Sequence, residues 1–169
     1  MRLVQNTTDI PSETIETILR DVGGDGLSCA VRVRNCWNSP CFVGYFYPEM
    51  TGSITNRNGK VYELGGRKYG CRHVITMRVP WVCIPMPART SDGKRLWIEV
   101  PDRVTGLTLL AAHEVEHARR YEEGLDYGDQ RACDDRKLQV ARQLGLRISE
   151  RREELEGEEP VCSVPASSH

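Results

Sequence analysis

The stretch of sequence that decides the fold is LLAAHEVEHARRYEEG, residues 109–124. Its apolar and charged positions follow the period of an α-helix over several turns. Two histidines stand four positions apart in it, His113 and His117, and Glu114 directly follows the first of them. Positions i and i+4 of a helix lie on the same face, about 6 Å apart along the axis. The stretch therefore predicts a helix that presents two imidazoles on one side.

The residues around this helix indicate where it begins and ends. Asp102 or Thr105 can cap its N-terminus, and Gly124 lies just after its last turn. After the short connection LDYG, the sequence predicts a second helix from about Asp129 to Leu144. We expect this second helix to pack antiparallel to the first, because the connection is short.

The segments before the long helix predict a sheet and one further helix. Residues 10–22, IPSETIETILRDV, have apolar positions spaced for one helix face. Strands are expected at residues 29–35, where alternation predicts a half-exposed strand, at 73–80 and at 95–101, with a loop over 84–94. Strands gathered before a helix pair indicate an α+β fold. We expect a small twisted sheet with an N-terminal helix, then the histidine-bearing helix and the second antiparallel helix, all packed on one face.

Length and composition suit a single domain, which we place at residues 1–147 of the 169. Residues 148–169 are charged and then rich in Pro and Ser, which predicts a disordered tail. The chain has no run of about 18 apolar residues and no apolar leader, so we expect a cytoplasmic protein without membrane contact. Its seven cysteines should then be mostly free thiols. The net charge of −1 gives no support to a nucleic-acid partner.

The two histidines can act together as metal ligands. Zinc accepts imidazole nitrogens at about 2.0–2.1 Å, and His113 and His117 can converge on one such ion. Glu114 points about 100° around the helix from His113, so its carboxylate would lie beside the ion rather than on it. Since zinc lowers the pKa of a water molecule to about 7, one carboxylate is a sufficient base. The pattern predicts one catalytic Zn²⁺ with Glu114 as general base, and a charged surface helix is the simpler alternative.

Residues 113–117, HEVEH, form an HExxH motif, and on this motif the chain resembles the zincin metallopeptidases. The layout of residues 1–145, an opening helix and a small sheet before the motif, also looks like that of small SprT-like or phage-type metallopeptidases. The resemblance implies a zincin-like fold and hydrolysis of peptide bonds, with Glu114 taking a proton from water and passing it to the leaving amine. It also implies a protein or peptide substrate, which we expect as an added strand along residues 95–101.

The resemblance further implies a third zinc ligand from the second helix. Gluzincin-type members place there a glutamate that opens a Glu-x-x-x-Asp pattern, whereas this chain has Gln130 and Asp134 at the two positions. Asp134 shares a helix face with Leu138 and Ala141, and a carboxylate on an apolar face needs a partner, which a metal would supply. Asp134 is therefore the first candidate for the third ligand. Asp129, which can equally serve as a helix cap, is the second.

These expectations converge on a zinc metallopeptidase with His113, His117 and Asp134 on the metal and Glu114 as base. The alternative is a catalytically weak or inactive zincin-fold protein that binds a protein or DNA partner. The neutral Gln130 at an expected anionic position favours that alternative. The intact pair of histidines with a glutamate between them favours the enzyme.

Other residues carry weaker signals. A structural metal site is a further hypothesis for four residues whose spacings match no common zinc knuckle, Cys36, Cys41, Cys71 and His73. Buried or loop thiols and a strand histidine are the simpler interpretation. Glu116 is expected to be solvated. Tyr127 and Arg131 lie in a segment from which a donor to the oxyanion of the reaction could come.

Overall fold

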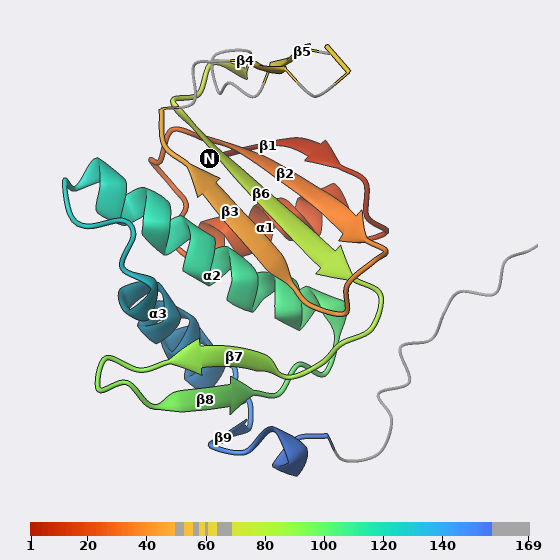
Figure 1. The fold of residues 1–169 in the computed structure, drawn as a ribbon, viewed down its shortest axis with the longest axis vertical. Helices are drawn as coiled ribbons and strands as arrows, with labels where there is room; N and C mark the ends of the chain where they lie inside the picture. The colour runs from red at the N-terminus through yellow and green to blue at the C-terminus, as the bar shows by residue number, and fades with distance from the viewer. Residues whose placement is uncertain (50–52, 56–57, 60, 64–68, 157–169) are drawn as a thin grey trace, which may run out of the picture.

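The computed structural model describes residues 1–49, 53–55, 58–59, 61–63 and 69–156, and these form an α+β fold (Figure 1). The helices are α1 (Ser12–Asp21), α2 (Arg103–Glu122), α3 (Gln130–Gln143) and a short 3-10 turn, η2 (Arg152–Glu154). The strands are β1 (Arg2–Asn6), β2 (Cys29–Cys36), β3 (Val43–Tyr47), β4 (Ser53–Thr55), β5 (Val61–Glu63), β6 (His73–Pro80), β7 (Met86–Arg89), β8 (Arg95–Ile98) and β9 (Ile148–Ser149).

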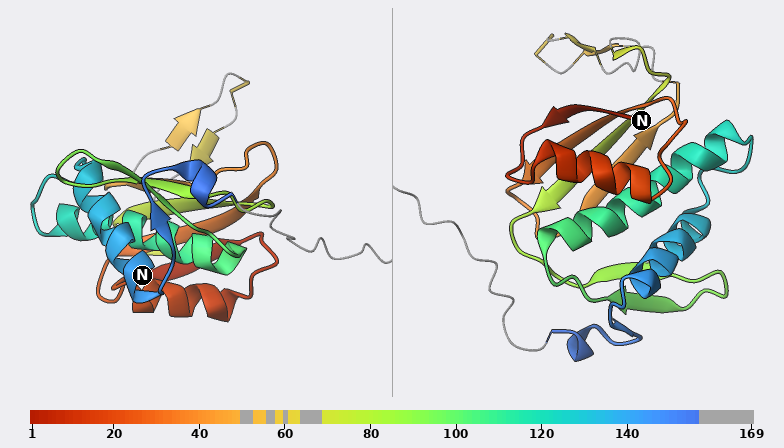
Figure 2. Two further views of the ribbon diagram at one scale, coloured as in Figure 1. Left: turned by 90° about the horizontal axis from the view of Figure 1, so that it is seen from below. Right: turned by 180° about the vertical axis from the view of Figure 1, so that it is seen from behind.

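The main sheet has four strands in the order β1-β2-β6-β3. The first three are parallel, and β3 runs antiparallel to β6 at the edge of the sheet. Helices α1 and α2 cover the same face of this sheet (Figure 2). Between them lies the core, in which Ile15, Met77 and Leu107 are fully buried. The predicted α+β class is confirmed, with α1 and α2 on one face of the main sheet, whereas α3, which was expected on the same face, packs on α2 and β7 instead.

The strand predicted over residues 29–35 is confirmed as β2, but its expected half-exposure is wrong. Residues 29–33 are all buried, because β2 lies in the middle of the sheet between β1 and β6. Even Arg32 is only 9% exposed, with its guanidinium carbon 5.7 Å from the ring centre of Tyr69. Alternation in the sequence shows which residues share a face, but it does not show whether a long side chain on the outer face is itself covered.

The strand predicted at residues 95–101 is confirmed over β8, but the loop expected at 84–94 is partly wrong. It contains β7, which pairs antiparallel with β8. Pro87 is tolerated there because β7 is an edge strand. On the other side of β8, β9 pairs with Trp97 and Ile98, so ordered structure continues beyond residue 147, where we expected the tail to begin. Residues 157–169 of that tail lie outside the described residues.

Helices α2 and α3 begin at side-chain caps and pack against each other. The Asp102 side chain accepts a 2.8 Å hydrogen bond from the backbone N–H of Thr105, so Asp102 is the cap of α2. Gly124, with φ of +71°, follows α2 where the chain turns back, and α3 runs antiparallel beside it (Figures 1 and 2). Asp129 caps α3, as its position predicted. Among the helices that the structure describes, none is long and apolar enough to cross a membrane.

Candidate metal centre

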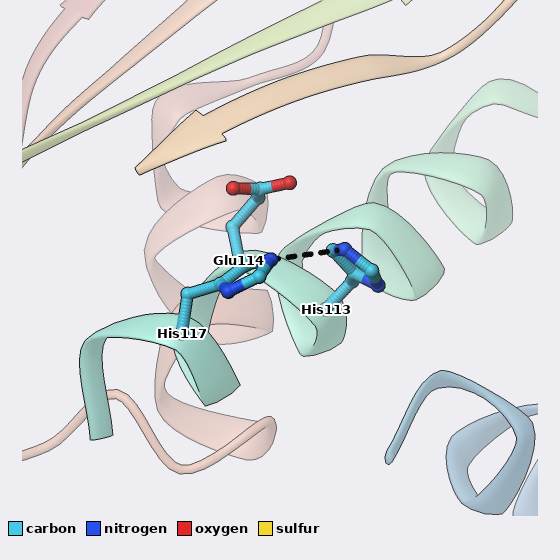
Figure 3. A group of neighbouring side chains, drawn as sticks. All are labelled: His113, Glu114 and His117. Atoms are coloured by element: carbon cyan, nitrogen blue, oxygen red, sulfur yellow. Dashed lines mark hydrogen bonds between the residues drawn. The ribbon is translucent and has the colours of Figure 1, made fainter. Parts of the chain in front are cut away.

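The two histidines of the motif point from the middle of α2 into a cleft of about 230 Å³. Strand β3 and the segment that precedes α3 form its other walls. The Nε2 atoms of His113 and His117 lie 3.1 Å apart, and the two rings meet edge to face (Figure 3). Two nitrogens bound to one tetrahedral zinc ion would be about 3.3 Å apart. The spacing therefore fits two ligands of one ion.

The other nitrogen of each ring lies close to an oxygen acceptor from a different segment. Nδ1 of His117 lies 2.5 Å from the backbone oxygen of Tyr127. Nδ1 of His113 lies 3.1 Å from Oδ1 of Asp134 on α3. A carbonyl only accepts a hydrogen bond, so Nδ1 of His117 carries the ring proton, whereas Asp134 lies close to Nδ1 of His113 without the alignment of a hydrogen bond. Nε2 of His117 then presents its lone pair to the cleft, and Nε2 of His113 lies within hydrogen-bond distance of it.

These contacts fit a metal ion. At 3.1 Å the two Nε2 atoms share one proton in a hydrogen bond, and a metal ion that displaced this proton would take both lone pairs. Burial lowers the pKa of His117, which favours the neutral imidazole that a metal requires. Metal-bound histidines commonly donate their second N–H to a carboxylate or a backbone carbonyl, and both kinds of acceptor are present here. Imidazole donors of this kind suit zinc.

Glu114 completes the cluster from the side of the main sheet. Its carboxylate points away from the two rings toward β3 (Figure 3), and its side chain belongs to a residue only 4% exposed. The potential ligand atoms of His113, Glu114 and His117 lie within 4.8 Å of one another, and within the described residues no other His/Cys/Asp/Glu group is as compact. Burial raises the pKa of Glu114 to about 8. A cation beside it would favour the ionised form that a general base needs.

The edge strand β3 approaches Glu114 so closely that any side chain at the point of contact would displace that of Glu114. A Cβ atom on Gly44 would lie 2.2 Å from Oε1 of Glu114 and 2.4 Å from its carboxyl carbon. The sequence did not single out Gly44, because a lone glycine in VGYFY carries no signal of a distant neighbour. The contact holds the carboxylate between the strand and the two histidines.

The structure separates the candidates for the third ligand. Asp129 is used as the cap of α3, and Asp134 faces Nδ1 of His113, on the side of the ring away from His117. Although burial alone would raise the pKa of Asp134, its contacts with His113 and Lys137 lower it to about 2. Oε1 of Gln130 lies 3.1 Å from Nε2 of His113 and lines the cleft. The fold therefore brings Gln130 to the cluster, and neither aspartate belongs to it.

Several other predicted residues lie elsewhere than expected. Among the described residues, Cys36, Cys41, Cys71 and His73 supply no group of three ligand atoms close enough to share an ion. The expected solvation of Glu116 is wrong, because it is 8% exposed and accepts hydrogen bonds of 2.9 and 2.5 Å from Arg119. Of the two residues considered as oxyanion donors, Tyr127 lines the cleft, whereas Arg131 is exposed and contacts the backbone oxygen of Ser91.

Comparisons of the chain with protein-family models, with curated proteins and with solved structures found no match. The resemblance to zincins is thus carried by the five residues of HEVEH and by the layout around them. The function has to be inferred from the chemistry of the cleft.

Proposed function

We propose that the chain is a zinc-dependent peptidase of the zincin type. The observation that carries this proposal is the pair of Nε2 atoms of His113 and His117, which lie 3.1 Å apart at the cleft with the buried carboxyl group of Glu114 next to them. A helix whose histidines had no ligand role would have no reason to bring two imidazole nitrogens together at a cleft and to bury a carboxyl group beside them.

In this proposal His113 and His117 bind the ion, and the amide oxygen of Gln130 is the third protein donor. Asp134, which we expected on the metal, acts instead as a positioning residue that orients His113 through Nδ1. The backbone oxygen of Tyr127 does the same for His117. Both rings are thereby held in the tautomer that leaves Nε2 available.

The carboxylate of Glu114 is the proposed general base. Zinc, when bound, polarises the scissile carbonyl and lowers the pKa of a water molecule to about 7. Glu114 accepts a proton from the attacking water and passes it to the leaving amine. The contact with Gly44 keeps this carboxylate beside the cleft through both transfers. Tyr127, which lines the same cleft, is the candidate donor to the oxyanion.

The proposed peptide-binding strand is β3 rather than residues 95–101. Strand β8, which covers most of that segment, is paired with β7 on one side and with β9 on the other, so it cannot take an additional strand at Trp97 and Ile98. Strand β3 is at the edge of the main sheet and borders the cleft through Gly44 and Phe46. An extended peptide can pair with such an edge through its backbone.

A specific feature also supports the alternative, a zincin-fold protein that binds a partner and hydrolyses little. A neutral amide oxygen is a weaker zinc ligand than a carboxylate, so Gln130 is expected to lower the affinity for the metal. Replacing it tests this: Gln130→Glu should strengthen zinc binding about tenfold or more, as measured by competition with a chromophoric chelator. Unchanged affinity would mean that the side chain at this position does not reach the ion.

The proposal is tested first by elemental analysis of the chain purified after growth with added zinc. We expect about one zinc ion per chain, and almost none in the His117→Ala variant, because one imidazole cannot hold the ion alone. Thermal melting of both proteins serves as the control for folding. Absence of zinc and of any other transition metal from the unaltered chain would contradict the proposal.

The Glu114→Gln variant separates the enzyme from the binding protein. Glutamine keeps the shape of the side chain but cannot accept the proton, so zinc content should be unchanged. Hydrolysis of a quenched fluorescent peptide library should fall by about 10²- to 10⁴-fold. A zinc-loaded parent chain that hydrolyses no peptide in the library would favour the binding protein.

A further inference from the structure

A second cavity adjoins the cleft and has a different character. Its volume is about 440 Å³, and it shares Gly44, His113 and Glu114 with the cleft. Its walls come from the start of β3, from α2 and from the β7–β8 pair, which Figure 1 shows below α2. Apolar side chains dominate these walls, among them Phe42, Val43, Ile84, Met86, Trp97 and Leu110. A group bound there would lie next to the reacting atoms.

Arginines surround the aromatic wall of this cavity. The guanidinium carbon of Arg95 lies 4.6 Å from the ring centre of Trp97, and that of Arg152 lies 5.4 Å from it. Arg89 stands directly opposite Arg95 in the antiparallel pairing of β7 with β8. Arg152 has an acidic partner, Glu156. In the part of the chain that the structure describes, neither Arg89 nor Arg95 has one.

Arg89 and Arg95 thus form a positively charged site that has no acidic partner among the described residues. Like charges directly opposite each other on neighbouring strands are destabilising, so Arg89 and Arg95 favour a negative group close to them. A guanidinium stacked on an indole still presents its N–H edge, which matches the two oxygens of a carboxylate. Of the two other cations that line the cavity, Arg152 pairs with Glu156 and Lys137 lies 2.7 Å from Asp134. Arg95 is therefore the residue placed to bind a carboxylate at the mouth of an apolar cavity.

We propose that this cavity selects the substrate of the adjoining cleft. It takes a bulky apolar side chain next to the cleaved bond, while Arg95 binds a carboxylate close to that residue in the same peptide. The carboxylate is either an acidic side chain or the free C-terminus. This inference rests on the proposed peptidase function and adds the substrate class, peptides in which a large apolar residue is accompanied by a carboxylate.

The experiment measures binding separately from cleavage. The zinc-loaded Glu114→Gln chain is titrated against fluorescein-labelled alanine hexapeptides, amidated at the C-terminus, that carry one Phe and one Glu one or two positions apart. Matched peptides replace Phe by Ala or Glu by Gln, and a further peptide with Gln has a free C-terminus. We expect fluorescence polarisation to show at least about tenfold tighter binding when both Phe and a carboxylate are present.

Two neighbouring variants assign the effect to Arg95. Arg95→Gln, made in the Glu114→Gln chain, should abolish the preference for a carboxylate and keep the preference for Phe. Lys94→Gln is the matched control, because Lys94 lies next in the chain, does not line the cavity and faces Glu150 at 3.8 Å. This control should change neither preference. If both variants lose the preference for a carboxylate equally, that preference comes from the overall positive charge of this surface, and the role of Arg95 is overturned.

The outcomes distinguish this inference from the proposed function. Equal binding of the Phe and Ala peptides, or of the peptides with and without a carboxylate, overturns the inference even if the parent chain cleaves peptides. A preference restored only by the free C-terminus supports it with the C-terminal carboxylate as the source. If the parent chain cleaves none of these peptides but both preferences persist, the proposed hydrolysis fails and the assigned ligand class stands.

Discussion

Two buried histidine environments in this chain differ in which ring nitrogen is left available. His73 on β6 is fully buried, its Nδ1 accepts a 3.0 Å hydrogen bond from the backbone N–H of Glu49, and its Nε2 lies 3.3 Å from Glu122. In His113 and His117 the roles are reversed, because Nδ1 faces an acceptor and Nε2 faces the cleft. The His73 ring uses its lone pair in a hydrogen bond from the backbone, whereas His113 and His117 point Nε2 into the cleft.

The difference teaches that a neighbouring carboxylate alone does not make a histidine a ligand. All three rings have an oxygen acceptor near one nitrogen. What distinguishes the α2 pair is that the acceptor lies beside Nδ1, so that Nε2 is the nitrogen that faces the cleft. His73 also packs against the rings of Phe46 and Tyr121, and it lines neither the cleft nor the second cavity.

The largest expected effect comes from removing one ring from each environment. His113→Ala should lose the bound zinc entirely, whereas His73→Ala should keep about one ion per chain. The second variant should instead lose about 2 kcal/mol of unfolding free energy, because it leaves a cavity in the core. Elemental analysis and urea denaturation measure the two quantities. If the His73→Ala chain folds but loses its zinc, the two histidine environments do not differ in metal binding and the comparison fails.

A smaller effect is expected from the carboxylates behind the rings. Asp134→Asn should weaken zinc binding by about 10- to 100-fold, because the amide orients Nδ1 of His113 less strongly than an ionised carboxylate does. Glu122→Gln, the matching change beside His73, should leave zinc affinity unchanged. Competition with a chromophoric chelator measures both, and a melting curve reports whether Lys137 still packs in the Asp134 variant. If the two variants bind zinc with equal affinity, Asp134 does not contribute to the metal centre.

The smallest of these effects concerns the strand that borders the cleft. Gly44→Ala would place a methyl group 2.2 Å from Oε1 of Glu114, so the carboxylate must shift. Since a small displacement of a catalytic group is costly, kcat should fall by about tenfold or more while zinc content stays the same. Peptide hydrolysis under saturating substrate measures this. An unchanged kcat would mean that Glu114 does not act from the position that β3 imposes.

Local patterns predicted a large part of the fold. Helices α1, α2 and α3 and strands β2, β6 and β8 were all expected, because each carries its own periodicity or β-branched residues. Strands β1, β3, β7 and β9 were not expected. Strand β9 has only two residues, and all four are edge strands or pair with a single neighbour, so their stability comes from that pairing rather than from their own sequence. For the same reason, the sequence did not predict that β3 lies at the edge of its sheet or that β8 is paired on both sides.

The sequence by itself determined that His113 and His117 share one helix face with Glu114 beside them, because four residues are about one helical turn in any fold. It also determined that a second helix would follow closely with Gln130 and Asp134 on it. Only the tertiary structure decided whether Gln130 or Asp134 lies at the cleft and which nitrogen of each histidine points into it. It also decided which glycine lets β3 approach Glu114. Those features depend on contacts between residues far apart in the chain, and no local period encodes such contacts.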